Sequence, residues 1–306
     1  MAPGGYAWWY VDALSDDGDS GLTLIAFIGS VFSPYYAWQR RRAAGGAADA
    51  TDHCAINIAL YGRGGKRWAM TERGRAALAR DATTLRVGPS SLVWRDGALE
   101  AEIDEVTVPI PSRVRGRFRV EPLAVMTQPY ALDAGGVHHW QPIAPCARIE
   151  VEFERPHRVW RGHAYVDHNR GDAPLERHFV RWDWSRATLG GGDAAVLYDV
   201  TRRDGTPLSL ALRFDAAGRV SGFSPPPPAA LPTTGWRIVR GTRSDAGHPA
   251  RVHHTLEDTP FYARSLVGMQ LNGEPATAVH ESLSLDRFTA PIVQAMLPFR
   301  MPRRAR

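Results

Sequence analysis

Apolar residues in this 306-residue chain recur mostly at every second position or in short continuous runs, and seldom at the 3.6-residue period of a helix. The chain contains 29 glycines and 23 prolines, which separate the runs, and turns at 95–97 and 202–205 join several of them as hairpins. The pattern predicts an all-β protein. The expected strands are 6–14, 22–31, 54–61, 92–94, 98–106, 115–122, 148–153, 159–166, 179–184, 194–202, 208–214, 236–241 and 252–258.

Two short segments, 71–80 and 286–297, show the periodicity of a helix. In the second, Phe288 and Val293 lie on one face, Asp286 can cap the first turn, and Pro291 falls close to that turn. We therefore expect few helices, all of them short.

The composition changes near residues 140–151, where two prolines precede a new strand, and this change predicts a domain boundary between residues 146 and 147. The two parts, 1–146 and 147–306, each hold enough strands for a barrel or a sandwich. The tripeptide Tyr-Val-Asp occurs in both, at 10–12 and at 165–167. Antiparallel barrels of about eight strands have no free edges and can enclose one apolar ligand. We expect two lipocalin-like β domains.

Composition and charge exclude several classes of protein. Apolar residues make up 44% of the chain and charged residues 23%, which argues against disorder and against a membrane-embedded protein. The longest apolar run, 22–32, is too short to span a bilayer, and no secretion signal is expected. The net charge of +5 comes from arginine without a nucleic-acid motif. The basic segment 298–306 fits either a solvated tail or contact with anionic lipid headgroups.

The sequence gives little support for a metal site or a covalent nucleophile. Adjacent histidines of one strand point to opposite faces, so the pairs at 138–139 and 253–254 each offer at most one ligand. The two cysteines, Cys54 and Cys146, lie far apart, and no G-x-S-x-G motif is present. The ten tryptophans are the more unusual feature, since they either form core or line a pocket for a long apolar molecule.

The segment 165–171, YVDHNRG, places Asp167 and Tyr165 on one face of a strand. Two interpretations remain open at this point. Asp167 either caps backbone amides in a turn before Gly171, or it is a catalytic group.

The segment 253–265, HHTLEDTPFYARS, offers a second acidic position. Strict alternation places His254 and Asp258 on the more apolar face of a strand and Glu257 on the solvent face. An apolar setting would raise the pKa of the Asp258 carboxyl group and keep it protonated, as a Brønsted acid requires. The alternative is an aspartate that accepts backbone hydrogen bonds at the end of a strand.

Several long segments of unusual composition occur along the chain. They are GGYAWWYVDALSDDG, GLTLIAFIGSVFSPYYAW, HCAINIALYG, RWAMTERGR, VGPSSLVW, HHWQPIAP, LERHFVRWDWSR and LEDTPFYARS. Together they resemble the carotenoid 1,2-hydratases, or hydroxyneurosporene synthases, of purple photosynthetic bacteria over nearly the whole chain. That family is similar to a broader group of paired lipocalin-like domains that includes fungal pericyclases.

The resemblance implies addition of water to the terminal C1=C2 double bond of acyclic carotenoids such as neurosporene and lycopene, with no redox or metal cofactor. Protonation at C2 would give a tertiary cation at C1, which aromatic faces stabilise by about 0.5–2 kcal/mol each. The implied partners are the carotenoid, water and a membrane surface, and not nucleic acid. The implied location is peripheral, on the cytoplasmic side of the intracytoplasmic membrane.

On this resemblance Asp258 is the first choice for the proton donor and Asp167 the second, with His254 or Tyr165 positioning the water or tuning the acid. The candidate substrate-binding residues are Trp8, Tyr10, Trp182, Trp184, Phe261 and Tyr262. Two other functions stay open: a lipocalin-like carrier that binds a terpenoid unchanged, and a pericyclase of the same superfamily, which would tolerate Asp258→Asn.

Overall fold

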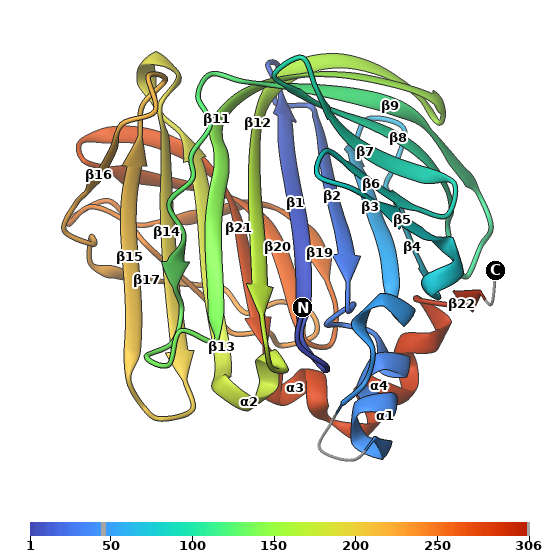
Figure 1. Cartoon of the computed structure of the whole chain (residues 1–306). Coiled ribbons are helices and arrows are strands. Elements are labelled where there is room, and N and C mark those ends of the chain that lie inside the picture. The colour runs from blue at the N-terminus through green and yellow to red at the C-terminus, as the bar shows by residue number, and fades with distance from the viewer. Residues whose placement is uncertain (44–46, 305–306) are drawn as a thin grey trace. The chain divides into compact units, whose positions relative to one another are not determined.

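The computed structural model describes residues 1–43 and 47–304 and consists mainly of antiparallel strands with a few short helices (Figure 1). The expected all-β, lipocalin-like class is confirmed. The chain forms two compact units, the first from Met1–Pro174 with Ala295–Arg306, and the second from Leu175–Gln294. The second unit is therefore inserted near the end of the first.

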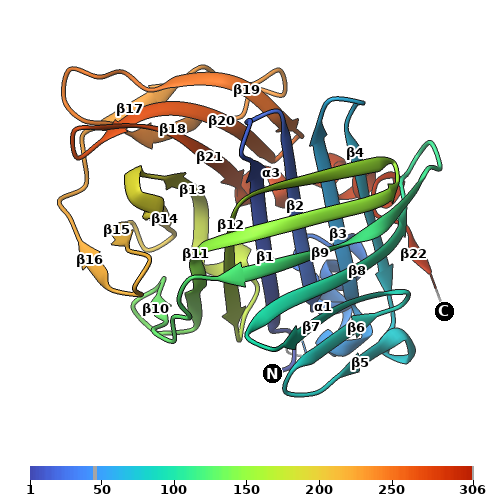
Figure 2. The same ribbon diagram turned by 90° about the horizontal axis from the view of Figure 1, so that it is seen from above.

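The first unit contains a 13-stranded sheet that curls over on itself at the end where β5 to β9 lie (Figure 2). Its strand order is β22-β4-β3-β2-β1-β12-β11-β9-β8-β7-β6-β5, with β10 beside β11. The strands are β1 (Tyr6–Ser15), β2 (Ser20–Ile28), β3 (Cys54–Gly62), β4 (Arg67–Arg73), β5 (Leu78–Arg80), β6 (Thr84–Val87), β7 (Ser90–Arg95), β8 (Ala98–Val106), β9 (Arg113–Pro122), β10 (Tyr130–Ala131), β11 (His138–Arg155), β12 (His157–Gly171) and β22 (Arg303–Arg304).

The centre of this sheet is buried on both faces. Val11 and Ala13 of β1 point into the apolar core of the unit with Leu24 of β2 and Val166 of β12. Since side chains of a strand alternate between faces, the even-numbered residues of β1, from Tyr6 to Asp12, lie on the opposite face. That opposite face carries the candidate site described below.

The second unit contains a seven-stranded sheet in the order β16-β15-β14-β13-β21-β20-β19, and a separate pair, β17 and β18. Its strands are β13 (Phe179–Thr188), β14 (Ala194–Arg202), β15 (Pro207–Phe214), β16 (Val220–Gly222), β17 (Pro228–Leu231), β18 (Arg240–Arg243), β19 (Arg251–Asp258), β20 (Tyr262–Leu271) and β21 (Glu274–Ser284). The α-helices of the whole described chain are α1 (Pro34–Arg42), α2 (Leu175–His178), α3 (Leu285–Thr289) and α4 (Pro291–Met296).

The expected boundary between residues 146 and 147 falls inside β11, a single strand of 18 residues. The prolines that suggested a boundary lie at irregularities of this strand, because the register with β12 shifts between Pro142 and Ala144 and again between Ala144 and Ala147. A bulge tolerates a residue that has no backbone N–H to donate. The composition change therefore marks a bulged strand, while the two units divide at Pro174.

The helix expected at 71–80 is wrong. Residues up to Arg73 belong to β4, where they pair with β3, and a 3₁₀ turn (Arg75–Ala77) then leads into β5. The helix expected at 286–297 is divided into α3 and α4, because Ala290 adopts an extended conformation (φ −60°, ψ 132°) before Pro291, as residues before proline prefer. Among the described residues, no helix is long and apolar enough to cross a membrane.

Candidate functional site

Two neighbouring strands of the first unit place carboxyl and phenol groups together on one face. In the antiparallel register of β1 and β12, Tyr10 lies opposite Asp167, and Asp12 lies opposite Tyr165. Cross-strand partners project to the same face, so the four side chains lie at the corners of a square. The two tyrosines are on one diagonal of this square and the two aspartates are on the other. All four are buried, with exposed fractions of 5% or less.

Asp167 is held by three hydrogen bonds from neutral donors. The Tyr165 hydroxyl and the Trp140 Nε1–H both donate to Oδ2 at 2.9 Å, and the Asn169 amide donates to Oδ1 at 3.0 Å. These contacts fix the orientation of the carboxyl group and stabilise the carboxylate that remains after a proton leaves. Burial, together with the nearby Asp167 and Asp12, raises the pKa of Tyr165 well above its ordinary value, so that its hydroxyl stays a donor.

Aromatic rings extend along the same face. The Tyr6 and Trp8 rings stack with centroids 5.0 Å apart, and Trp8 contacts Phe27 of β2 at 6.2 Å. On the other side, the Trp140 ring lies 5.4 Å from that of Tyr130. Rings of this kind bind hydrocarbon chains and also tolerate a developing cation. The arrangement can therefore present one carboxylic acid to an apolar, electron-rich ligand.

The structure brings together four of the residues expected from the sequence: Trp8, Tyr10, Tyr165 and Asp167. Asp12, Trp140 and Asn169 were not expected. A signal for Asp12 was present in the repeated Tyr-Val-Asp tripeptide, since the copies at 10–12 and 165–167 are the segments that pair.

The other expected residues belong to the second unit. Trp182 packs edge to face against Tyr198 with ring centroids 6.3 Å apart, and Phe261 contacts Phe288 at 5.2 Å. Trp184 is buried and Tyr262 is partly buried. Trp182 and Phe261 therefore pack against rings of their own unit.

The orientation expected for the segment around Asp258 is wrong. His254 is exposed, Asp258 is half-buried and accepts a hydrogen bond from the Trp236 amide at 3.1 Å, and Glu257 is only 4% exposed. The register between β19 and β20 shifts between Val252 and His254 and again between Thr255 and Glu257. Each shift interrupts the alternation from which the inward direction of Asp258 was inferred.

The second unit holds a buried polar network centred on Asp183 of β13. Asp183 accepts a hydrogen bond from the Ser282 hydroxyl, which lies 3.0 Å from His280 Nε2, and His280 Nδ1 lies 2.9 Å from the Ser185 hydroxyl. Burial raises the pKa of Asp183 to about 6 and lowers that of His280 to about 3. The network satisfies polar groups that an apolar interior would otherwise leave unpaired.

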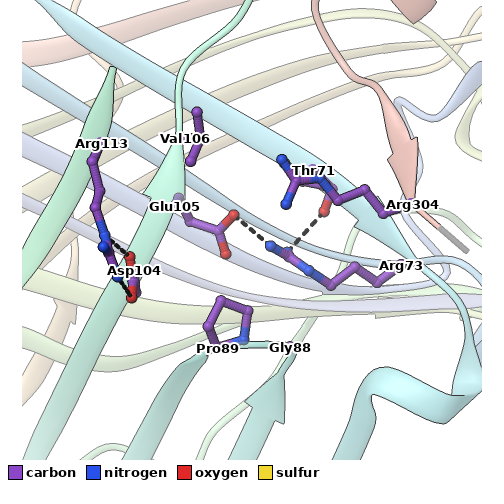
Figure 3. Close-up of a pocket in the computed structure, with 9 residues that line it drawn as sticks. All are labelled: Thr71, Arg73, Gly88, Pro89, Asp104, Glu105, Val106, Arg113 and Arg304. Carbon is purple, nitrogen blue, oxygen red and sulfur yellow. Dashed lines mark hydrogen bonds and ion pairs between the residues drawn. The ribbon is translucent and has the colours of Figure 1, made fainter. Parts of the chain in front are cut away.

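A pocket of about 340 Å³ in the first unit is lined mainly by charged residues (Figure 3). Arg73 donates to Glu105 at 2.8 Å, and Arg113 binds Asp104 through two hydrogen bonds of 2.8 and 2.6 Å. A lining of ion pairs does not suit a hydrocarbon ligand. Within residues 1–43 and 47–304, no group of three or more His, Cys, Asp or Glu residues is placed to hold a metal ion.

The fold and the site together define a lipocalin-like protein with a buried acid among aromatic rings. The sequence profile of the family Carotenoid hydratase CrtC matches residues 24–306, and the chain belongs to this family. It is 62% identical to the acyclic carotenoid 1,2-hydratase of Thiocapsa roseopersicina, over 99% of this chain and 74% of that protein. It is 56% identical to the protein of the same name from Rubrivivax gelatinosus, over 100% of this chain and 75% of that protein.

Among solved structures, the chain is similar to a putative AttH from Nitrosomonas europaea, with a TM-score of 0.63, 16% identity, and coverage of 91% of this chain and 92% of that one. At this identity the likeness shows the fold alone.

Proposed function

We propose that the protein is an acyclic carotenoid 1,2-hydratase in which Asp167 is the proton donor. The observation that carries this proposal is the buried Asp167 carboxyl group, oriented by the neutral groups of Tyr165, Trp140 and Asn169 beside a row of aromatic rings. The names of the relatives described above support the substrate class. Asp258 is not our choice, because it lies half-buried at a strand end in a different unit.

In the proposed reaction Asp167 gives its proton to C2 of the terminal C1=C2 bond of an acyclic carotenoid such as lycopene or neurosporene. The positive charge that develops at C1 is stabilised by ring faces, for which Trp8 and Trp140 on the same face of the sheet are candidates. Water then adds at C1. The net change is addition of H and OH across a double bond, which leaves the overall oxidation state unchanged and requires no redox cofactor.

Incubation of the purified protein with lycopene in detergent, without oxygen or added cofactors, tests this function. We expect a product heavier by one or two molecules of water. A non-catalytic carrier would return the carotenoid at its original mass although it binds it. That second result would contradict the proposal.

We also propose that the protein binds the cytoplasmic surface of the intracytoplasmic membrane, where its substrate dissolves. Trp38 of α1 is 55% exposed and lies under the Arg42 guanidinium, 4.6 Å from ring centroid to Cζ, and Phe299, next to Arg300, is 78% exposed. Exposed rings beside arginine are typical of interfacial anchors on anionic lipid.

We expect flotation with anionic liposomes at low salt, and weaker binding of the Trp38→Ser and Phe299→Ser variants. Ile110→Ser serves as the matched control, because Ile110 is an apolar residue that is 81% exposed and lies outside these arginine-rich segments. Equal flotation of all four proteins, or none at any salt concentration, would refute the proposed anchors.

A further inference from the structure

The two Tyr-Val-Asp tripeptides of the chain are cross-strand partners. Residues 10–12 of β1 run antiparallel to residues 165–167 of β12, so that each tyrosine lies opposite the aspartate of the other copy. In each copy the tyrosine hydroxyl donates to the aspartate two residues later on its own strand, at 3.4 Å for Asp12 and 2.9 Å for Asp167. The site therefore contains a second carboxyl group, Asp12, in a setting related to that of Asp167 by a local two-fold axis.

The local two-fold symmetry does not extend to the neighbouring strands, β2 beside β1 and β11 beside β12. Beyond β12, Trp140 donates to Asp167. Beyond β1, Thr23 of β2 lies opposite Asp12 and projects to the same face. Thr23 is 4% exposed, and its hydroxyl has no hydrogen-bond partner among the described residues.

A buried hydroxyl without a protein partner indicates a place for a bound molecule that can donate and accept hydrogen bonds. Buried polar groups in native proteins are almost always paired, and ordered water commonly supplies the missing partner. A water molecule on the Thr23 hydroxyl would lie beside the Asp12 carboxyl group, on the face that also carries Asp167.

We infer that Thr23 and Asp12 bind the water that attacks the carotenoid, and that Asp12 is the base that takes its proton. This inference rests on the proposed hydratase function and adds to it the residues of the capture step. Diagonal neighbours across two strands are about 7–8 Å apart. Inverting glycosidases also use one carboxyl group as the acid and a second as the base that activates a water. Their two carboxyl groups lie about 6.5–9.5 Å apart, which leaves room for that water between the base and the substrate.

The electrons and protons of the reaction balance with these two carboxyl groups. The π electrons of C1=C2 form a bond from C2 to the proton of Asp167, which leaves a carboxylate on Asp167 and a cation at C1. A lone pair of the bound water forms the C1–O bond, one O–H bond breaks, and its proton passes to the carboxylate of Asp12. Exchange of that proton back to Asp167 completes the cycle.

Reaction in D₂O separates the two steps. The wild-type protein should place one deuterium at C2 of the hydrated product. Asp12→Asn should lower hydration by about 100-fold or more, as loss of a general base does, yet still exchange deuterium into C2 of the recovered substrate, because the cation forms and reverts. Asp167→Asn should lose both hydration and exchange.

Thr23 provides an independent test with a matched control. Thr23→Val keeps the shape of the side chain and removes the hydroxyl, so we expect hydration to fall about tenfold while deuterium exchange persists. Thr23→Ser keeps the hydroxyl and should stay within about twofold of wild type. This pair remains informative if Asp12→Asn does not fold, as judged by its thermal unfolding temperature.

The outcomes distinguish the inference from the proposed function. A wild-type product without deuterium at C2 would refute the acid step and hence the proposed mechanism. With that label present, a folded Asp12→Asn that hydrates normally, or that loses exchange together with hydration, would overturn the role of Asp12. Normal hydration by Thr23→Val would overturn the water site.

Discussion

Asp167→Asn is expected to lower the rate of carotenoid hydration by about 10³-fold while the protein stays folded. The asparagine amide is far too weak an acid to protonate a carbon atom, and loss of a general acid typically costs about 10²–10⁴-fold. Its amide oxygen can still accept the hydrogen bonds that Trp140 and Tyr165 donate to Oδ2 at 2.9 Å. The measurement is initial rate of product formation from lycopene, with thermal unfolding as the check on folding.

Asp258→Asn is the matched control, since Asp258 is an aspartate at the end of a strand in the second unit and is half-buried. We expect this variant to hydrate lycopene at close to the wild-type rate. Loss of activity in Asp258→Asn together with retention in Asp167→Asn would reverse the assignment of the proton donor.

Asp183→Asn is expected to change how stability depends on pH. Burial raises the pKa of Asp183 to about 6, above its ordinary value of 3.8, although the hydrogen bond from Ser282 opposes the shift. Between about pH 4 and pH 6 the folded state then binds more protons than the unfolded state, so the Asp183 contribution to the free energy of unfolding falls as pH rises. The difference between a pKa of about 6 in the folded state and the ordinary 3.8 corresponds to about 3 kcal/mol of unfolding free energy.

Asparagine does not titrate, so Asp183→Asn lacks the loss of stability that Asp183 causes in the wild type as pH rises. From pH 4 to pH 7, the unfolding free energy of the variant should therefore increase relative to that of the wild type by up to about 3 kcal/mol. Urea unfolding at several pH values measures this difference. The neighbouring His280, whose pKa of about 3 produces the opposite slope, is present in both proteins and largely cancels.

Asp215→Asn is the control for this experiment. Hydrogen bonds from the backbone and side chain of Arg219 lower the pKa of Asp215, so its contribution is lost only at pH values below its ordinary pKa. Its difference from wild type should stay constant above about pH 4. A constant difference for Asp183→Asn as well would contradict the expected titration.

The local pattern of apolar and polar residues was sufficient to predict many of the strands. The predicted bounds of 98–106 and 194–202 are those of β8 and β14. β8 alternates nearly regularly between buried and less buried residues, whereas β14 begins as a continuous buried run. Prediction failed where tertiary pairing overrides local preference. Residues 71–73 have neighbours of good helix propensity, yet they continue a strand because β3 offers them a hydrogen-bonding partner.

The candidate site was only partly accessible from the sequence. Tyr165 and Asp167 could be placed on one face because β12 is regular at that point in its pairing with β1. The inward direction predicted for Asp258 failed because a bulge adds one residue to a strand, and no local signal in 251–258 reveals it. Asp12 joins the site through the pairing of β1 with β12, more than a hundred residues further along the chain, and Trp140 joins it through a hydrogen bond to Asp167, 27 residues away. Periodicity reveals neither contact.

The insertion of the second unit near the end of the first has a consequence for synthesis of the protein. Arg303 of β22 forms an ion pair with the buried Glu72 of β4, and β22 covers that edge of the sheet. These residues are synthesised after the whole of Leu175–Gln294. Until β22 has been synthesised, the nascent first unit has an uncovered β4 edge and a Glu72 that lacks its Arg303 partner. An uncovered edge can pair with other chains.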